Sequence, residues 1–512
     1  MHEGKAPAAA ADAPGFKRGI RLFDAVMIVV GVMIGSGIFI VSADIARSVG
    51  ATGWLLAVWL FSGLVTLLGA ACYGELAALM PQAGGQYVYL RESFGRLTGF
   101  LYGWTLFMVI QTGSIAAVGM AFAKHLALLV PSLGEQQVVL SVGVVDVSAA
   151  QLVAIASIAL LTWLNTLGLR EGKLVQDSFT VAKVAALLVL VVCGLALARH
   201  SGAIAANFHD MWSANRVVVG ADGSVTREAL TGIGLLMALG AASVGSLFAC
   251  DAWNNVTFTS GETVNPQRTI TRALVMGVAV VVVIYMLTNL VYVLALPVAG
   301  LPDAADVAGR GLQFATADRV GTAAASTILG PVAAAIMAVL VMISTFGCNN
   351  GMILTGARVY YAMAHDGLFF RRTGTLNRRR VPAAALVMQG VWACLLCLTG
   401  RYGDLLDYVI FAVLIFYALS VVGIFVMRRR RPTAERSWRA PGYPVLPALY
   451  VLAAVAICVD LLIVKPRYSW PGLLIVGLGV PVFWLWGRSS PPRGRRPTRP
   501  TTRASDRPGR GP

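Results

Sequence analysis

A glycine-rich interruption of an apolar run constrains this chain more than any other feature. No charged residue occurs between Asp24 and Asp44, and the run is long enough to cross a bilayer as one helix. Its centre, residues 31–39, reads GVMIGSGIF and holds three glycines and a serine within seven residues. Because glycine weakens a helix interior, this pattern predicts that the helix breaks at membrane depth and frees backbone N–H groups.

A broken helix inside a bilayer is tolerated only where the freed backbone lines a cavity or is buried in protein. The N-terminus of the second half-helix would then direct partial positive charge at whatever occupies the cavity, as in an anion site. Close packing of helices through small residues explains the same glycines without a ligand. This stretch alone leaves both interpretations open.

The composition places the chain in a membrane. Of its 512 residues 57% are hydrophobic and 13% are charged, which is far more apolar than a soluble globular protein. Reading from charge to charge gives twelve stretches that are long enough to span a bilayer. They are approximately 22–45, 49–79, 97–125, 148–168, 175–198, 230–259, 273–298, 325–364, 382–400, 407–427, 442–463 and 469–487. The predicted fold class is an all-α polytopic membrane protein with twelve transmembrane helices.

The distribution of basic residues predicts the orientation. Alternate segments on the side of the N-terminus hold 29 of the 41 Lys and Arg residues. This asymmetry predicts that both termini are cytoplasmic, in a multi-pass protein of the cell membrane, and it replaces nucleic-acid binding as the explanation of the net charge of +17. Residues 1–16 and the basic tail 489–512 are predicted to be disordered, and residues 17–488 to form the membrane domain.

Two classes of chemistry find no support. The seven cysteines all fall within predicted spans, which favours packing over disulfides or a metal cluster. The five histidines are scattered at helix ends and in loops, without an HExxH motif or a nucleophile–base spacing. The sequence therefore predicts neither an enzyme nor a bound metal or cofactor.

Two ionisable residues, Lys183 and Asp251, lie inside predicted spans, whereas nearly all others lie at span boundaries. An ionisable group inside a bundle is costly, so by default it indicates a functional role and a specific partner. The alternative for Lys183 is that its long side chain reaches the cytoplasmic interface.

A second interruption occurs five helices after the first, in the span 230–259. Its polar and small residues are Gly240, Gly245, Asp251, Trp253, Asn254 and Asn255. Corresponding breaks in two five-helix halves are typical of an inverted-repeat transporter with a binding site near the bilayer midplane. The two repeats are predicted at about 22–198 and 230–427, with helices 1 and 6 discontinuous.

Three segments together resemble the amino acid–polyamine–organocation superfamily, most closely the L-type amino acid transporters and their prokaryotic relatives. They are GSGIF in helix 1, LFACDAWNNVTFTSGETVNPQR in helix 6 and FGCNNGMILTGARVYYAMAHDG in helix 8. The similarity extends from about residue 17 to 430. It implies a five-plus-five inverted repeat with two further helices, alternating access, and a substrate held between helices 1 and 6.

The resemblance assigns helix 1 to the carboxyl end of an amino acid substrate. The backbone N–H groups around Ser36 and Gly37 would hold the α-carboxylate, which agrees with the anion preference of a helix N-terminus. Met33 and Ile34 would line the pocket for the substrate side chain.

Helix 6 would bind the other end of the substrate. By the same resemblance, the carbonyls of Phe248, Ala249 and Asp251 would hold the α-ammonium, and Phe248 would be an aromatic gate. Trp253 and Asn254 match the Trp-Asn pair of the family. Asn254 would either bind the substrate or fix the unwound turn.

Lys183 matches a helix-5 lysine of the family, whose ammonium occupies the place of a cation between helices 1 and 8 in sodium-coupled relatives. This argues against sodium coupling and leaves proton coupling open. The expected neighbours are helix-1 carbonyls near Gly31 and one of Ser344, Thr345 or Asn349 in helix 8.

The sequence departs from the family at Cys250, where an aromatic residue is common, and at Ala252, where glycine is common. Asp251 stands where some relatives have glycine; it would contact a basic substrate, carry a proton or cap freed N–H groups. Residues 126–147 contain no cysteine, so no disulfide-linked heavy chain is expected.

The predicted function is secondary active transport of neutral L-amino acids, by exchange or by proton-coupled uptake. The alternative substrates are cationic amino acids or polyamines. A transporter-like amino acid sensor is the alternative outside this class.

Overall fold

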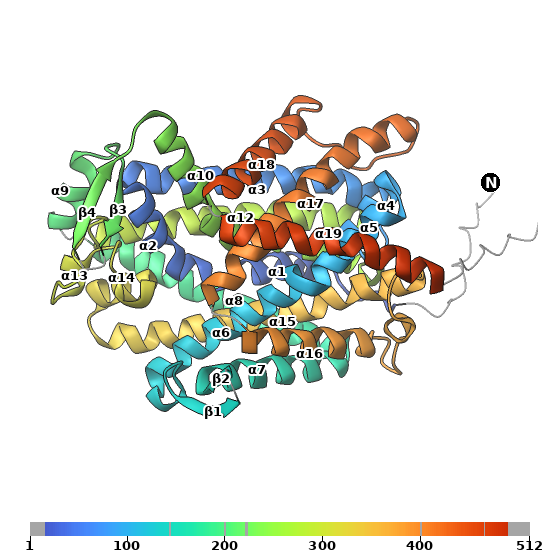
Figure 1. Cartoon of the computed structure of the whole chain (residues 1–512), viewed down its shortest axis with the longest axis horizontal. Helices are drawn as coiled ribbons and strands as arrows, with labels where there is room; N and C mark the ends of the chain where they lie inside the picture. Colours follow the sequence, from blue (N-terminus) through green and yellow to red (C-terminus); the bar gives the residue numbers. More distant parts are fainter. Residues whose placement is uncertain are drawn as a thin grey trace, which may run out of the picture.

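The computed structural model of the protein describes residues 16–142, 145–198, 201–220, 224–399, 402–464 and 466–489. In this part of the chain, long helices run along one common direction, as Figure 1 shows. The predicted disordered segments 1–16 and 489–512 lie outside the described residues, apart from residues 16 and 489.

Most of the long helices are continuous. They are α3 (Thr52–Leu79), α6 (Gln111–Leu129), α7 (Ala149–Thr166), α8 (Leu169–Leu197), α12 (Pro266–Ala295), α15 (Val332–His365), α16 (Ala383–Thr399), α17 (Tyr402–Arg430), α18 (Val445–Val464) and α19 (Pro466–Ser489). A π-helical turn, η1 (Leu106–Ile110), joins α5 (Arg96–Thr105) to α6.

Two spans are broken. The first consists of α1 (Leu22–Met33) and α2 (Gly37–Val49), and the second of α10 (Gly232–Ala249) and the short α11 (Asn255–Phe258). The remaining short helices are α4 (Gln86–Phe94), η2 (Pro131–Leu133), α9 (Ser201–His209), η3 (Ser260–Glu262), α13 (Val307–Arg310), η4 (Thr316–Asp318), α14 (Val320–Leu329) and η5 (Arg371–Gly374). Two antiparallel hairpins, β1 (Val138–Val142) with β2 (Val145–Ser148) and β3 (Asn215–Val219) with β4 (Val225–Ala229), lie in the connections after α6 and α9.

The helical polytopic fold is confirmed. Among the described residues, ten helices are long and apolar enough to cross a membrane, and α1 with α2, bent by 41°, makes an eleventh span. The predicted span 382–400 corresponds to α16, which has 17 residues and is shorter than a typical spanning helix. The count of twelve and the repeat boundaries stay predictions.

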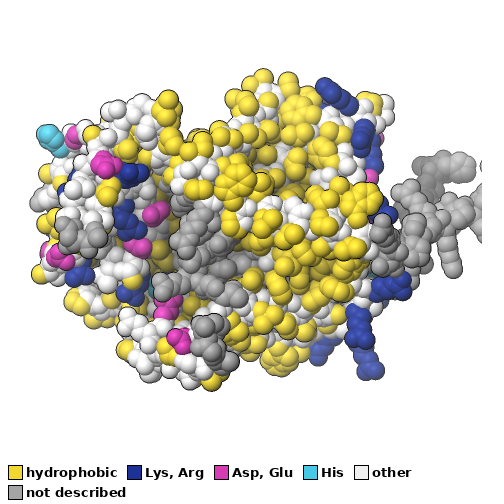
Figure 2. All heavy atoms as spheres, in the orientation of Figure 1, with side chains coloured by type: hydrophobic (Ala, Val, Ile, Leu, Met, Phe, Trp, Pro, Cys, Tyr) yellow, Lys and Arg dark blue, Asp and Glu magenta, His cyan; other side chains and the backbone are white. Residues whose placement is uncertain are grey.

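The surface fits a lipid environment. Figure 2 shows hydrophobic side chains from the middle to the right of the face in view, with Lys and Arg side chains toward both ends and most Asp and Glu side chains toward the left-hand end. Large apolar side chains such as Leu174, Val192 and Leu236 are about two-thirds exposed. A soluble monomer rarely exposes a contiguous apolar area of this kind.

The glycines of α10 have a different role from the predicted one. Gly240 and Gly245 lie within the continuous helix, and the break follows at residues 250–254. A Cβ atom at Gly245 would lie 2.6 Å from Cγ1 of Val41, and one at Gly240 would lie 2.3 Å from Oδ2 of Asp460. These glycines therefore permit close packing of α10 against α2 and α18 rather than breaking the helix.

One buried ion pair fixes the ends of the two broken spans. The guanidinium of Arg358 on α15 donates two hydrogen bonds to the Glu262 carboxylate, each 3.0 Å long, and both side chains are 1% exposed. The backbone carbonyl of Glu262 also accepts hydrogen bonds from the N–H groups of Gly19 and Ile20, just before α1. The pair thus joins η3, α15 and the chain segment that enters α1.

We expect Arg358→Ala to lower the free energy of unfolding by roughly 3–5 kcal/mol, because it leaves the Glu262 carboxylate buried without its partner. Unfolding of the purified protein in detergent measures this. Arg216→Ala is the control, because Arg216 pairs with Glu228 on the exposed β3–β4 hairpin at 3.1 Å and should change the stability by less than about 1 kcal/mol. Similar losses in both variants would contradict the assignment.

Candidate functional site

The break between α1 and α2 leaves a run of backbone carbonyls without helical partners, and side chains from three other helices bind all of them. The acceptors and their donors are Gly31 with Lys183 (2.5 Å), Val32 with Cys348 (3.0 Å), Met33 with Tyr285 (2.9 Å) and Ile34 with Lys183 (2.7 Å), while Ile34 and Gly35 share the single hydroxyl proton of Ser344 (3.0 and 3.1 Å). Because buried carbonyls must be hydrogen-bonded, these donors stabilise the break.

Lys183 on α8 makes the strongest contribution, because its ammonium group is charged. The side chain is 1% exposed, and its Nζ donates to the carbonyl oxygens of Gly31, Ile34 and Ser344, the last at 3.2 Å. The ammonium therefore lies inside the bundle between α1 and α15, which are the predicted helices 1 and 8. It does not reach the cytoplasmic interface, which was the alternative considered from the sequence. Of the three helix-8 residues considered from the sequence, Ser344 is its partner.

The opposite side of the break presents N–H groups. Those of Gly37 and Ile38, at the start of α2, make no backbone hydrogen bond within the described part of the chain. Gly37 lines a cavity of about 20 Å³, which has room for about one water molecule. The lining residues are Val32, Met33, Gly35, Ser36, Gly37, Ser114, Val118, Phe248, Ala249, Asp251, Ala252, Cys348 and Met352.

The C-terminal end of α10 closes this cavity from the other side. The carbonyl of Phe248 accepts a hydrogen bond from the Asp251 N–H (3.1 Å), and that of Ala249 lies 3.1 Å from the Tyr285 hydroxyl. The Phe248 carbonyl also accepts from the Cys250 N–H, whereas the Ala249 carbonyl, which has two lone pairs, can accept one more donor. Tyr285 also contacts the Met33 carbonyl, so its hydroxyl bridges the two breaks.

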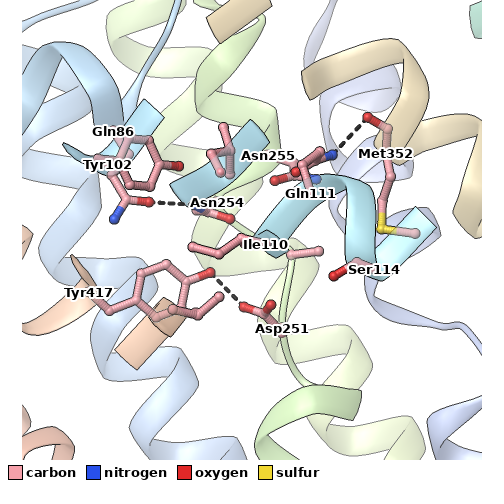
Figure 3. A pocket seen from close by; sticks show the side chains of 13 residues that line it. Gln86, Tyr102, Ile110, Gln111, Ser114, Asp251, Asn254, Asn255, Met352 and Tyr417 are labelled. Atoms are coloured by element: carbon pink, nitrogen blue, oxygen red, sulfur yellow. Dashed lines mark hydrogen bonds between the residues drawn. The ribbon is translucent and has the colours of Figure 1, made fainter. Parts of the chain in front are cut away.

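A second cavity of about 20 Å³ adjoins the first, and Ser114, Asp251, Ala252 and Met352 line both. Figure 3 shows that the Asp251 carboxylate points toward Tyr417 of α17, whose hydroxyl donates to it at 2.6 Å. The other polar groups around this cavity belong to Gln86, Tyr102, Gln111, Asn254 and Asn255.

The turn that carries Asp251 is fixed from two directions. The Asn254 amide donates to Oε1 of Gln86 at 2.7 Å, so Asn254 ties the unwound turn to α4. Trp253 is buried against the rings of Tyr73 and Tyr417, with centroid separations of 4.8 and 5.1 Å. Ala252 has a φ of 63°, a left-handed conformation that glycine adopts with less strain, in line with the glycine that the family resemblance implies there.

The structure brings most of the predicted residues together. Six of them line the first cavity: Met33, Ser36, Gly37, Phe248, Ala249 and Asp251. Asn254 lines the second cavity, and Trp253 lies behind the turn. Ile34, which was expected in the side-chain pocket, lines neither cavity, because its side chain is fully buried and its carbonyl faces Lys183.

Several residues of the site were not predicted. Tyr285, Cys348, Gln86 and Tyr417 each donate or accept a hydrogen bond at one of the two breaks. Tyr285 and Cys348 carry a weak signal, since each is a polar group within an apolar span. Nothing local to these residues indicates which carbonyl they meet.

The sequence was compared with known proteins. Residues 20–480 match the family model described as amino acid permease. The human b(0,+)-type amino acid transporter 1 is 28% identical over 452 residues, which cover 88% of this chain and 84% of that protein. The mouse Asc-type amino acid transporter 1 is 28% identical over 497 residues (96% and 86%), and the mouse large neutral amino acids transporter small subunit 2 is 28% identical over 470 residues (92% and 81%).

We expect Gly37→Val to reduce ligand binding at least tenfold, or about 1.4 kcal/mol, while the protein still inserts into the membrane. A Cβ atom at position 37 would lie 2.6 Å from Cβ and 3.0 Å from Cα of Ala249, so the two half-helices must separate. Gly234→Val is the matched control, because a Cβ atom there meets nothing within 4 Å. Normal binding by the Gly37 variant would rule out a site at this break.

Lys183→Ala removes the donor from the carbonyls of Gly31, Ile34 and Ser344. We expect it to lower the free energy of unfolding by about 1–3 kcal/mol and either to impair transport or to make it respond to sodium. The measurements are unfolding in detergent and uptake into proteoliposomes with and without sodium. Lys124→Ala is the control, since Lys124 is 38% exposed and pairs with Glu135. If Lys183→Ala changed neither the free energy of unfolding nor uptake, the ammonium would have no role at the break.

Proposed function

This chain belongs to the amino acid permease family, and we propose that it is a secondary transporter that carries neutral L-amino acids across the membrane by alternating access. One observation carries the proposal. The N–H groups that begin α2 and the carbonyls that end α10 meet at one cavity. The first set complements a carboxylate and the second an ammonium group, and both groups belong to every α-amino acid.

The walls around this backbone site support neutral side chains as the substrate class. Val32, Met33, Val118, Phe248 and Met352 supply most of the lining beyond the two half-helix ends. Phe248 is partly buried beside the cavity, a position that suits an aromatic gate. The relatives named above include transporters described as Asc-type and as carrying large neutral amino acids.

A cationic amino acid is the second candidate, and Asp251 is the observation that favours it. One oxygen of the carboxylate accepts from Tyr417, and Asp251 lines both cavities, where no other charged residue of the described chain lies. A basic side chain in the second cavity would meet this carboxylate. The b(0,+)-type relative is described simply as an amino acid transporter.

Exchange or proton-coupled uptake is proposed rather than sodium coupling. The Lys183 ammonium occupies the space between α1 and α15 and uses the carbonyl oxygens that would otherwise coordinate a cation. The excess of basic residues on one side supports a cell-membrane location with both termini in the cytoplasm. The absence of a disulfide-linked heavy chain stays a prediction, supported by the cysteine-free segment 126–147.

Counterflow in proteoliposomes tests the function. Vesicles are preloaded with one unlabelled amino acid and offered labelled alanine, leucine or lysine, with and without sodium or proton gradients. We expect neutral amino acids to stimulate uptake of labelled leucine without sodium. A requirement for a proton gradient would identify a symporter, and the absence of flux under all conditions would favour the sensor.

Asp251→Asn separates the two substrate classes in the same assay. If neutral amino acids are the substrates, leucine counterflow continues and lysine does not compete in either protein. If the carboxylate binds basic side chains, lysine competes with the unaltered protein and its apparent affinity falls roughly 30-fold or more in the variant. Asp303→Asn, in an exposed loop, is the matched control.

A further inference from the structure

A larger cavity lies away from the candidate site, at the left-hand end of the bundle in Figure 1, where α13 and α14 are labelled. Its volume is about 400 Å³, against about 20 Å³ for each of the two site cavities. Its walls come from the last turn of α6, from α13, η4 and α14, and from the first turn of α15. This volume lies in the range of ligand-binding pockets.

Two arginines supply the only charges in its walls among the described residues, Arg310 and Arg319. The Arg310 guanidinium donates to the Ala304 carbonyl (2.8 Å) and the Thr316 hydroxyl (2.7 Å), and Arg319 donates to the Thr316 carbonyl (3.2 Å). All three acceptors are neutral. These bonds hold the guanidinium groups in place without neutralising them.

Among the described residues, neither arginine forms an ion pair with a carboxylate. Asp318, the residue next to Arg319, pairs with Arg47 of α2 at 2.6 Å instead. Burial lowers the pKa of the Arg319 guanidinium below its usual range, and no acidic group opposes that shift. A partly desolvated cation without a counter-charge costs free energy, which a bound anion would recover.

The rest of the cavity is mainly apolar and opens where two spanning helices end. Leu128 and Leu129 of α6 line it on one side, and Pro331, Ala334 and Ala335 on the other. Beside it, Val332 and Ile336 on α15 are 72% and 53% exposed. Since α15 and the span Arg96–Leu129, which ends with α6, have the length and composition of membrane spans, their ends lie at the level of the lipid headgroups.

We propose that this cavity binds an anionic phospholipid, with the phosphate between Arg310 and Arg319 and the upper acyl chains against Leu128, Leu129 and Val332. The charge favours an anion, and arginine matches the geometry of phosphate oxygens. The volume and the apolar wall favour a ligand with a hydrocarbon part over a free inorganic ion. An amino acid is a poorer match, because no carboxylate in the cavity would receive its ammonium group.

A lipid bound in this cavity would also stabilise the broken span. The helix α14 packs against α2 as well as against α15, and a Cβ atom at Gly321 of α14 would lie 2.8 Å from Cδ1 of Phe39 on α2. A lipid that holds η4 and α14 in place therefore supports the half-helix whose N-terminus forms the candidate site. The lipid site does not depend on the identity of the transported substrate.

The thermal midpoint of the delipidated full-length protein in detergent tests this site without measuring transport. Phosphatidylglycerol, phosphatidylcholine and inorganic phosphate are titrated separately. We expect phosphatidylglycerol to raise the midpoint of the unaltered protein and of the control Arg216→Ala. In Arg319→Ala the half-saturating concentration should rise roughly tenfold to a hundredfold, because hydrogen bonds to a charged group are lost.

Ala334→Trp serves as a second variant in case Arg319→Ala disturbs folding. It keeps both arginines and fills the cavity, so the effect of phosphatidylglycerol should again be lost. An unchanged response in both variants, or an equal response to phosphatidylcholine, would overturn the proposal. An equal shift with inorganic phosphate would identify a free-anion site and would equally overturn the lipid assignment.

Discussion

The ammonium group of Lys183 is the interaction on which the rest of the site depends. A helix can break inside a bilayer only if its freed carbonyls find donors, and one charged side chain supplies them for Gly31, Ile34 and, across the interface, Ser344. The side chains of Tyr285, Cys348 and Ser344 complete the set at Met33, Val32 and Gly35. Because Lys183 comes from α8, the break is held by the tertiary structure rather than by the glycines alone, which only make it possible.

Once the break is held, the chemistry of the cavity follows from helix geometry. The start of α2 offers N–H groups and the end of α10 offers carbonyls, and the Tyr285 hydroxyl contacts both breaks. Two opposed half-helix ends complement the two charges of an α-amino acid. Asp251, held by Tyr417, adds a charge next to this backbone site. Under the proposed function, the backbone would recognise what all amino acids share, and side chains such as Phe248 and Asp251 would distinguish between them.

The fold and both breaks could be predicted from the sequence because their signals are local: charge-free runs, the GSG triplet and the polar cluster from Asp251 to Asn255. Lys183 could be assigned to the helix-1 carbonyls because the family resemblance implies that place for a lysine of helix 5; its position inside a span predicted only that it has a specific partner. The roles of Gly240 and Ile34 could not be predicted, because they depend on which faces of distant helices meet. The same holds for Gln86, which reaches Asn254 from α4. The hairpins after α6 and α9 lie in connections for which no strands were predicted.

The most direct test of the central claim is a cryo-EM structure of the protein in lipid nanodiscs, saturated with an amino acid that it transports. The account predicts that the substrate carboxylate lies within hydrogen-bonding distance of the N–H groups that begin α2, at Gly37 and Ile38, with its ammonium at the carbonyls of Phe248 and Ala249 and with Lys183 still bonded to helix 1. Substrate density elsewhere, or a carboxylate bound directly to Lys183, would contradict it.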